Sequence, residues 1–393
     1  MTTVQSPPAR GTRPPNRREL IIAAAAELFS RNGFAAVSMS DIAAAVAIGP
    51  SALYRHFRSK DQLLATVIAD AIAGTDAATQ SLASGSLADI AHALAEAALA
   101  QRNTGVLWHR EARHLPIPAR TEQQAQIGVI VERLSRLVRA QRSGLNSADA
   151  GLVVHAALSV AHSVSFHRLA LPADRYRDLL AEMVESALVA PVGPAQSGQP
   201  AVRTGTLQAQ SRREAILEES VALFSRRGYA GVSMEDIGTA VGIAGPSLYK
   251  HFSSKADILS AALFRGEEWL RRDMSDVFAT AGDALQGLAG LVSAYTDFAF
   301  DHPYLVQILM SESHHLPDAD YRRARAAQRN YISEWLRLAQ ALHPDWDATT
   351  ARIRVQAAQM LINEVAIDAG VRSHPAAAVT ATAIANDILD IAT

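Results

Sequence analysis

The sequence predicts an all-α protein built from two similar units in tandem, and three observations lead to this prediction. The stretch 37–60, VSMSDIAAAVAIGPSALYRHFRSK, returns at 232–255 as VSMEDIGTAVGIAGPSLYKHFSSK, without a gap. Apolar residues recur at helical spacing over most of the remaining chain. Residues 190–206, APVGPAQSGQPAVRTGT, lack such periodicity and have the composition of a linker. A repeat of this length indicates a duplicated structural unit.

Each copy of the repeat predicts two short helices joined by a tight turn. Ser38 and Ser233 stand where an N-cap is expected, and Asp41 or Asp236 follows three residues later. Because a capping box normally carries Glu or Gln at that position, we expect the box to be incomplete. The first short helices are expected at 41–46 and 236–241, the turns at 47–49 and 242–244, and the second helices from about Pro50 and Pro246.

The second short helix of each copy carries small, hydroxyl and basic residues on its outer face. In the first copy Leu53 and Phe57 fall on the inner face, whereas Ser51, Tyr54 and Arg55 point outward. A pair of helices with a tight turn, the second exposing such residues, is the helix-turn-helix arrangement that enters the major groove of DNA. The chain is therefore predicted to carry two DNA-binding motifs.

Three sequences recur in order in both copies: LFSRNGF or LFSRRGY, then VSMxDIxxAVxI, then LYRHFRSK or LYKHFSSK. Both copies thereby resemble the DNA-binding domain of the TetR/AcrR family of bacterial transcriptional regulators. The resemblance covers nearly fifty residues in each half, and an Ala/Leu-rich helical segment of about 130 residues follows each copy, as in the family. Most members carry one such unit and work as homodimers, whereas this chain carries two.

The resemblance implies which residues contact a double-stranded operator. Matching positions in the family usually contact the phosphate backbone, which positions the protein without reading sequence. In this chain they are Tyr54, His56, Lys60, Tyr249, His251 and Lys255. Base reading is expected from Pro50, Ser51, Ala52 and Arg55 in the first copy and from Gly245, Pro246, Ser247 and Lys250 in the second. Ser38 and Ser233 complete the predicted DNA-binding set.

The two copies differ at the positions expected to read bases. The Gly-Pro-Ser triplet lies at 49–51 in the first copy and, one position later in the repeat, at 245–247 in the second. Arg55 corresponds to Lys250, and these residues are not interchangeable at a bidentate guanine contact. We therefore expect two unlike half-sites. Ala47 stands where the second copy has Gly242; if the turn requires a positive φ there, alanine costs about 1 kcal/mol.

The net charge of −2 is small for a DNA-binding protein, but the basic residues are unevenly distributed. Residues 1–64 hold eight Lys or Arg against four acids, and residues 201–259 hold seven against six. The first copy is therefore expected to bind DNA more tightly. Residues 1–16 are expected to be a disordered basic arm, which either contacts DNA or serves as a solubilising tail.

Several classes of function are not expected. The chain has no cysteine, which excludes disulfides, thiolate catalysis and Cys-type metal sites. No Gly-rich phosphate loop, nucleophile elbow or pair of catalytic carboxylates occurs, so an enzyme is not expected. The sequence shows neither a secretory signal nor a membrane span of about 18 apolar residues, which predicts a cytoplasmic protein without membrane contact.

The domain boundaries follow from these patterns. They predict an arm at 1–16, a first helix-turn-helix domain at 17–64, a helical ligand-binding and dimerisation domain at 65–189, a linker at 190–206, a second helix-turn-helix domain at 207–259 and a second ligand-binding and dimerisation domain at 260–393.

The helical domains also repeat, since EARHLP at 111–116 returns as ESHHLP at 312–317. In each segment a glutamate and a histidine three residues apart share one helical face, as metal ligands would. Further ligands are not imposed by any spacing, so a buried hydrogen-bonded pair is favoured, and neither a metal nor a cofactor is expected.

The resemblance implies a helical bundle around a small-molecule pocket, and a lipophilic or acyl-type effector fits the apolar composition. The lining is predicted to include Trp108, His109, Glu111, His155 and His162 in the first unit and Met310, Glu312, Trp335, Met360 and Asn363 in the second. Ligand binding is expected to release the protein from DNA, as in most family repressors, although activation is also open. The two units are expected to pack as an intramolecular pseudo-dimer.

Two alternatives remain. In the first alternative, one DNA-binding half is degenerate, and two chains form a homodimer that presents two intact motifs. In the second, the protein is a scaffold whose bundles bind partners and sense no ligand. The mass in solution distinguishes the first alternative, and thermal shifts with small molecules distinguish the second.

Overall fold

Helices account for the apolar periodicity of the sequence in the computed structural model, which describes residues 16–82, 85–193, 211–243 and 245–391. These ranges contain no strand, and the predicted all-α class is confirmed. The chain divides into two units, Met1–Val189 and Ala190–Thr393. The predicted arm, apart from residue 16, and the predicted linker from residue 194 onward lie outside the described residues.

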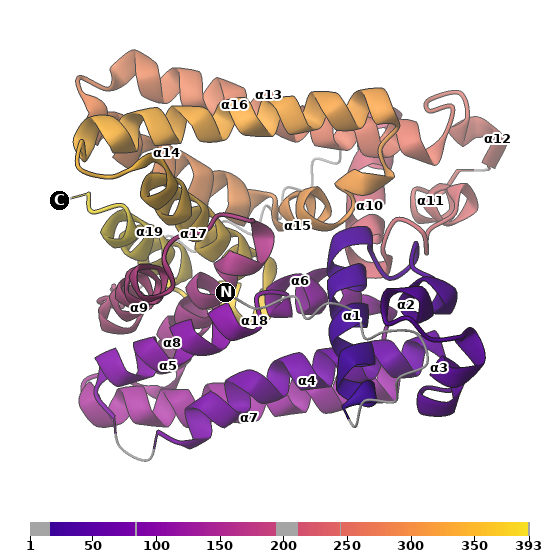
Figure 1. Cartoon of the computed structure of the whole chain (residues 1–393). Coiled ribbons are helices and arrows are strands. Elements are labelled where there is room, and N and C mark those ends of the chain that lie inside the picture. Colours follow the sequence, from indigo (N-terminus) through magenta and orange to yellow (C-terminus); the bar gives the residue numbers. More distant parts are fainter. Residues whose placement is uncertain (1–15, 83–84, 194–210, 244, 392–393) are drawn as a thin grey trace. The chain divides into compact units, whose positions relative to one another are not determined.

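The first unit consists of a three-helix domain followed by a longer helical bundle (Figure 1). Its α-helices are α1 (Arg17–Asn32), α2 (Met39–Ala45), α3 (Pro50–His56), α4 (Lys60–Gln80), α5 (Leu87–Ala100), α6 (Thr104–Val106), α7 (Ile117–Gln141), α8 (Ser147–His162) and α9 (Ala173–Val189). A π-helical turn at Leu107–Glu111 and 3₁₀ turns at Ala112–His114 and Ser163–Phe166 complete it. Helix α4 packs against α1, α5 and α7, and α9 packs against α5 and α8.

The second unit repeats this order (Figure 1). Its α-helices are α10 (Arg212–Arg227), α11 (Met234–Ala240), α12 (Gly245–Leu248), α13 (Lys255–Thr280), α14 (Ala284–Asp301), α15 (Pro303–Ser311), α16 (Asp318–Leu342), α17 (Ala348–Ile367), α18 (Ala369–Arg372) and α19 (Ala377–Ile388), with a 3₁₀ turn at Ser313–His315. Helix α13 packs against α10, α14 and α16, and α17 packs against α14, α16 and α19.

One continuous helix in each unit joins the three-helix domain to the bundle. The predicted boundaries after residues 64 and 259 fall inside α4 and α13. Ser59 and Ser254 begin these helices as N-caps, each accepting a hydrogen bond from a backbone N–H three residues on. The three-helix domain and the bundle therefore share one continuous helix in each unit.

The three-helix domains have matching cores. In the first unit Ile21, Phe29, Ile42, Leu53 and Phe57 are at most 1% exposed. Fully burying one such side chain stabilises the fold by about 1.5–3 kcal/mol. The counterparts in the second unit are Ile216, Phe224, Ile237, Leu248 and Phe252, which are at most 4% exposed. These cores fix which face of α3 and of the segment beginning with α12 points outward.

One helical stretch, Ser147–Phe166, is long and apolar enough to pass a test for membrane spans by length and composition alone. It is 61% buried inside the protein, as is typical of a core helix.

Candidate DNA-binding surfaces and effector cavity

A complete capping box begins the first helix of each motif, so the prediction of an incomplete box was wrong. The Ser38 Oγ accepts a hydrogen bond from the Asp41 backbone N–H at 3.1 Å, and the Asp41 carboxylate accepts one from the Ser38 backbone N–H at 2.8 Å. Ser233 and Asp236 repeat both bonds at 3.0 and 2.8 Å. The aspartate side chain is thus long enough for the reciprocal bond, and the helices begin two residues earlier than predicted, at Met39 and Met234.

The capping bonds lower the pKa of both aspartates. Hydrogen bonds from the Ser233 backbone and side chain, with help from Arg227, lower the pKa of Asp236 from 3.8 to about 2. The equivalent bonds from Ser38, its side chain first, lower the pKa of Asp41. Capping the helix engages both serine hydroxyls, which assigns these two predicted DNA-binding residues a structural role.

The turn of each motif places one residue in the left-handed region, with φ of 53° at Ala47 and 67° at Gly242. In the first motif the Ile48 N–H bonds to the Ala43 carbonyl at 2.9 Å and the Ala47 N–H bonds to the Ala44 carbonyl at 3.1 Å. This pair of bonds is the Schellman arrangement that ends a helix. The condition for strain at Ala47 is therefore met, and the alanine costs about 1 kcal/mol relative to the less restricted glycine.

Helix α3 presents the predicted outer face of the first motif. Its side chains at Pro50, Ser51, Arg55 and His56 are exposed, Tyr54 is 51% exposed, and Ala52 is half-buried. The exposure of this face is confirmed, whereas contact with DNA remains a prediction.

The second motif has a shorter recognition segment. Helix α12 spans Gly245–Leu248, four residues against seven in α3, so Tyr249, Lys250 and His251 lie in the turn that follows. Tyr249 is 53% exposed, Lys250 is exposed, and Ser247 and His251 are half-buried. The side chains at 245 and 246 are outside the described residues. The Arg213 Nη1 donates to the His251 carbonyl at 2.8 Å and fixes the end of the segment.

Lys60 and Lys255 point inward, and the structure does not support the predicted phosphate contacts. The Lys60 Nζ donates to the carbonyls of Phe34 and Val37 at 2.8 and 3.0 Å and lies 4.2 Å from the Phe34 ring centroid. The Lys255 Nζ donates in the same way to two carbonyls of the loop after α10, at 2.6 and 2.7 Å. Burial lowers the pKa of Lys255. Each lysine ties the first turn of the shared helix to this loop.

A buried glutamate in each bundle reaches the same loop. Glu111 is 1% exposed, and its Oε2 accepts a hydrogen bond from the Phe34 backbone N–H at 2.9 Å. Glu312 is fully buried and accepts from the Tyr229 backbone N–H at 3.2 Å. We call Glu111 with Phe34, and Glu312 with Tyr229, the two junctions. Both glutamates were predicted to line a ligand pocket; the structure shows them bonded to the three-helix domain, and ligand contact stays a prediction.

The histidine three residues after each glutamate also belongs to the junction. The His114 ring stacks on Phe34 with centroids 5.2 Å apart, and His315 stacks on Tyr229 at 4.7 Å. The sequence favoured a buried, hydrogen-bonded pair; the glutamates are buried, whereas the His114 and His315 side chains are 29% and 26% exposed and lie 4.0 and 3.6 Å from them. No group of three or more metal-ligating side chains occurs in the described part of the chain.

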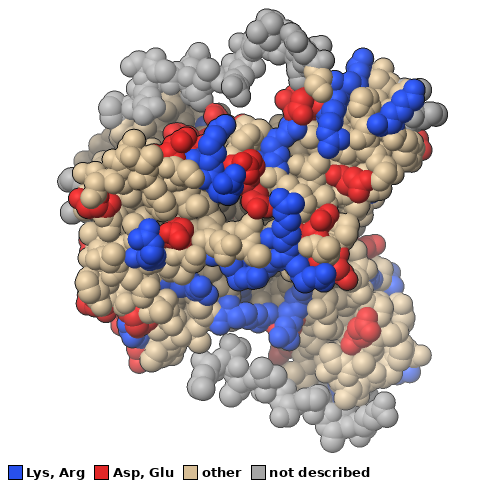
Figure 2. All heavy atoms as spheres, turned by 90° about the horizontal axis from the view of Figure 1, so that it is seen from above, with Lys and Arg blue, Asp and Glu red and all other residues tan. Residues whose placement is uncertain are grey.

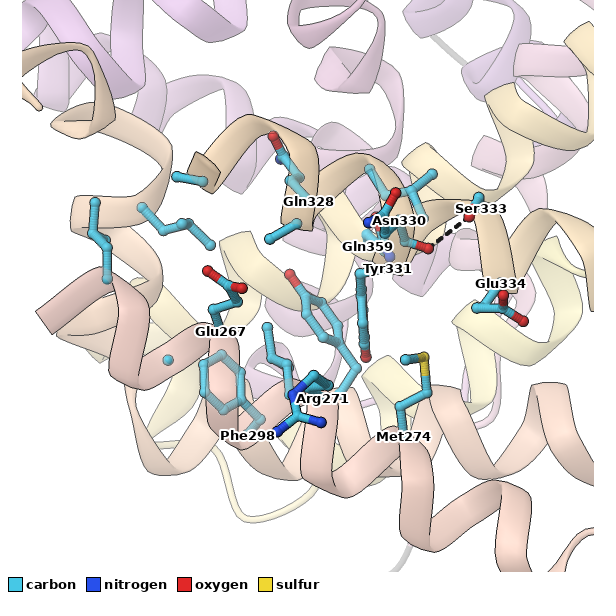
Figure 3. A pocket seen from close by; sticks show the side chains of 18 of the residues that line it. Glu267, Arg271, Met274, Phe298, Gln328, Asn330, Tyr331, Ser333, Glu334 and Gln359 are labelled. Atoms are coloured by element: carbon cyan, nitrogen blue, oxygen red, sulfur yellow. Dashed lines mark hydrogen bonds between the residues drawn. The ribbon is translucent and has the colours of Figure 1, made fainter. Parts of the chain in front are cut away.

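The bundle of the second unit has a cavity of about 490 Å³ that is open to solvent on the side of the exposed Gln328, Asn330 and Ser333 (Figure 3). Helix α13 contributes its face from Leu263 to Met274, and α16 contributes residues at helical spacing, including Gln328, Tyr331 and Glu334. The rest of the lining is Tyr295 and Phe298 from α14, Leu305 and Leu309 from α15, Gln359 from α17, and Ala324, Ala327, Asn330, Ile332 and Ser333 from α16. The walls are mostly apolar, as in ligand pockets generally.

None of the residues predicted for the second pocket is in this lining. Trp335 is fully buried in the core, Met360 is 9% exposed, and the Asn363 Oδ1 accepts a hydrogen bond at 2.8 Å from the hydroxyl of Tyr295, which does line the cavity. Met310 and Trp335 each follow a lining residue directly, so the prediction chose the right helices but the wrong faces. The lining positions 324, 327, 328, 331 and 334 recur at helical spacing, but they carry Ala, Gln, Tyr and Glu, so no apolar stripe marks this face in the sequence.

The residues predicted for the first pocket lie on two elements, the π-helical turn Leu107–Glu111 and helix α8. Trp108 and His109 are half-buried on the π-helical turn, with the His109 ring 6.3 Å from Phe166. His155 and His162 are half-buried on α8.

Charge on the surface is mixed. On the face shown in Figure 2, Lys and Arg side chains are interspersed with Asp and Glu, in keeping with a net charge of −2. The overall charge therefore does not favour attraction to a polyanion, and local groups such as the exposed Arg55 would have to supply it.

A three-helix domain with a capped helix-turn-helix, joined by one continuous helix to a bundle, defines a class of helix-turn-helix regulatory proteins, and this chain contains two such units. The sequence profile described as "Bacterial regulatory proteins, tetR family" matches residues 21–67 and again residues 216–262. Two segments of the chain, one in each unit, thus match this family model in tandem.

Similar proteins include both a transcriptional repressor and a transcriptional activator. The chain is 32% identical over 109 residues to the HTH-type transcriptional repressor KstR2 of Mycobacterium tuberculosis, an alignment covering 28% of this chain and 54% of that protein. It is 33% identical over 96 residues to the HTH-type transcriptional activator FasR of Mycolicibacterium smegmatis, covering 24% and 44%. The chain thus spans about half the length of the curated relatives that it matches. A TetR-family transcriptional regulator from Bordetella parapertussis has a similar structure with 22% identity and a TM-score of 0.42, covering 46% of this chain and 96% of that one.

Proposed function

We propose that the protein is a transcriptional regulator that binds an operator with two unlike half-sites, acting as an intramolecular pseudo-dimer in the cytoplasm. The observation that carries the proposal is the presence of two capped helix-turn-helix motifs with different outer faces in one chain. One motif offers Arg55 on a seven-residue helix, and the other offers Lys250 in the turn after a four-residue helix. Recognition elements that differ in side chain and in backbone favour different base pairs.

Repression released by a small molecule is the mode that we propose. Two observations support it: KstR2, the relative with the longer of the two alignments above, carries the name repressor, and the second bundle has a largely apolar cavity of about 490 Å³. A lipophilic effector, acyl-type molecules included, matches these walls in character. No catalytic role is part of the proposal.

The route from the cavity to DNA runs through two helices. Helix α13 lines the cavity from Leu263 to Met274 and begins at Lys255, immediately after the recognition segment. Helix α15 lines the cavity through Leu305 and Leu309 and leads into Glu312, which holds the Tyr229 N–H. A ligand that binds one position of these helices more tightly than another shifts the recognition segment and, by linkage, the affinity for DNA.

The four-residue α12 favours one alternative, in which the second motif has lost DNA binding and two chains present their first motifs together. The pseudo-dimer and the homodimer are distinguished by selecting DNA from a random duplex library with the full-length protein at a fixed salt concentration. Two unlike half-sites about one helical turn apart are expected for the pseudo-dimer. An exact palindrome would support the homodimer instead, and the absence of any enriched sequence would refute the regulator.

A further inference from the structure

The duplication provides an internal comparison for the cavity. Helices α7 and α16 each have 25 residues, and equivalent positions differ by 201 in residue number. Helices α4 and α13 are aligned at their capped starts, and their equivalent positions differ by 195. Each residue of the cavity walls on α13 and α16 therefore has a counterpart in the first unit.

Polar bonds bridge the corresponding helices of the first unit. The Arg133 Nη1 on α7 donates to the Asp76 Oδ1 on α4 at 2.7 Å and to the Thr79 Oγ1 at 2.9 Å. Gln123 is 4% exposed, and its Nε2 donates to the Ala65 carbonyl at 2.9 Å. Arg133 and Asp76 are only 20% and 19% exposed, so this ion pair is shielded from water and holds the two helices together.

The second unit has exchanged the charges of this ion pair and keeps a polar bond between α13 and α16 only nearer their starts, where the Ser260 Oγ donates to the Asp320 Oδ2 at 2.6 Å. Glu334 corresponds to Arg133, Arg271 to Asp76, and Ala324 to Gln123. The structure pairs Arg271 with Glu268 at 2.5 Å and Glu334 with Arg337 at 2.9 Å, each partner lying on the same helix as the residue that it pairs with. The residues that close α4 onto α7 thus become part of a cavity wall between α13 and α16.

One charged group of this wall has an unfilled acceptor. The Oε2 of Glu267 is buried and accepts no hydrogen bond from any described residue. Figure 3 shows its carboxylate at the cavity between α13 and α16. Arg271, one helical turn further along α13, is 62% exposed and pairs with Glu268, and Glu267 attracts it more weakly. A carboxylate in apolar surroundings is stabilised by a cation that pairs with it.

Aromatic rings in the cavity wall also favour a cationic ligand. Tyr295, Phe298 and Tyr331 line the same cavity, and the faces of such rings attract a cation. An anionic group at this place would instead face the negative charge of Glu267.

We propose that the effector site of the protein is confined to the second unit and takes an apolar cation, a hydrophobic amine or a quaternary onium ion whose positive centre pairs with Glu267. In the first unit, bonds from Arg133 and Gln123 hold the corresponding helices together instead. The proposal rests on the proposed function in one respect, namely that filling the cavity changes DNA binding.

The binding experiment uses a pair of probes matched in shape and opposite in charge. Tetraphenylphosphonium and tetraphenylborate are titrated into the full-length chain by calorimetry, with dodecyltrimethylammonium, below its micelle concentration, as a second cation. We expect the cations to bind with one site per chain and the borate to bind at least tenfold more weakly. A tighter or equal affinity for the borate, two equivalent sites per chain, or no binding of either cation would overturn the proposal.

Two variants of one residue locate the site. Glu267→Gln removes the charge at nearly constant volume and is expected to raise the Kd of tetraphenylphosphonium by roughly tenfold, equivalent to about 1.4 kcal/mol. Glu267→Asp keeps the charge and should retain most of the affinity. Glu334→Gln removes a rim carboxylate of the same cavity and should change the Kd less than about twofold. Equal Kd values for wild type and Glu267→Gln, with unchanged melting temperatures, would refute the role of Glu267.

Binding of the selected DNA is measured separately, with and without the cation. If the chain binds the cation through Glu267 but enriches no DNA, the site is correct and the proposed function is wrong. If the chain binds DNA and the cation does not require Glu267, the proposed function stands and the site is wrong.

Discussion

Glu111 and Glu312 hold the two junctions, and replacing them should loosen the three-helix domains in a graded way. Each glutamate is at most 1% exposed and accepts a hydrogen bond from the loop after the first helix of its unit. The Glu111 carboxylate is also paired with Arg110, whose Nη2 bonds the Ser30 carbonyl at 2.7 Å. Glutamate-to-glutamine and glutamate-to-alanine variants separate charge from contact at each junction.

The expected magnitudes follow from the bonds that each variant removes. Glutamine keeps an acceptor for the Phe34 N–H but replaces a charged hydrogen bond by a neutral one, a loss of about 1 kcal/mol. Alanine leaves that buried N–H without a partner, which costs about 1–3 kcal/mol in addition to the bond. The effect should be smaller at Tyr229, because the bond from Glu312 is longer, 3.2 against 2.9 Å, and only partly buried.

Amide hydrogen exchange at Phe34 and Tyr229 in the full-length protein measures these losses. If exchange proceeds through local opening, it should accelerate about fivefold per kcal/mol, so about fivefold for Glu111→Gln and considerably more for Glu111→Ala. Glu132→Ala is the control, since Glu132 is 69% exposed and pairs only at 3.8 Å with Arg136 on its own helix. Unchanged exchange at Phe34 in Glu111→Ala, or an equal change in the control, would refute the assignment of the junction.

Three further predictions concern the motifs. Ala47→Gly should stabilise its domain or leave it unchanged, and Gly242→Ala should destabilise its domain by about 1 kcal/mol, because both positions have a positive φ; denaturant unfolding checks this, and destabilisation in both variants would contradict it. Because the pKa of Asp236 falls from 3.8 to about 2 on folding, its cap stabilises the protein above pH 4 and is lost as the pH falls toward 2. Asp236→Asn should therefore lower the melting temperature at pH 7 but have little effect at pH 2, and a constant difference would argue against the cap. Arg55→Ala and Lys250→Ala should each weaken binding to a different half-site by about 1–3 kcal/mol at constant salt, and shift assays on operators with one altered half-site would show if both act on the same one.

The internal repeat allowed the helices and their starts to be predicted from the sequence. A pattern seen once is ambiguous, whereas the same apolar positions and the same capping serines at an offset of 195 residues identify helices and their starts twice. The turn could also be predicted, because a glycine at position 242 opposite Ala47 indicates a left-handed residue, and the φ values confirm it.

The sites were harder to predict because they depend on which face of a long helix points inward. Lys60 and Lys255 sit at a helix start where a phosphate contact is reasonable, yet both ammonium groups bond to carbonyls contributed by a loop more than twenty residues earlier. Glu111 and Glu312 share a motif with histidines, which favoured a buried Glu–His pair, but the glutamates accept hydrogen bonds from backbone N–H groups about eighty residues away. Contacts of this kind arise from tertiary packing and leave no local signal in the sequence.

The continuity of α13 has a mechanical consequence. The helix extends from Lys255, beside the recognition segment, to Thr280, and its cavity face is centred near Glu267, twelve residues from its start. At 1.5 Å per residue this is a lever arm of about 18 Å, so a tilt of about 10° at the cavity displaces the start of the helix by roughly 3 Å. Successive base pairs are spaced by about 3.4 Å along DNA. A small tilt of α13 at the cavity is therefore enough to move the recognition segment by nearly one base-pair step. Under the proposed function, the size of a bound ligand would then determine how the recognition segment is aligned with the operator.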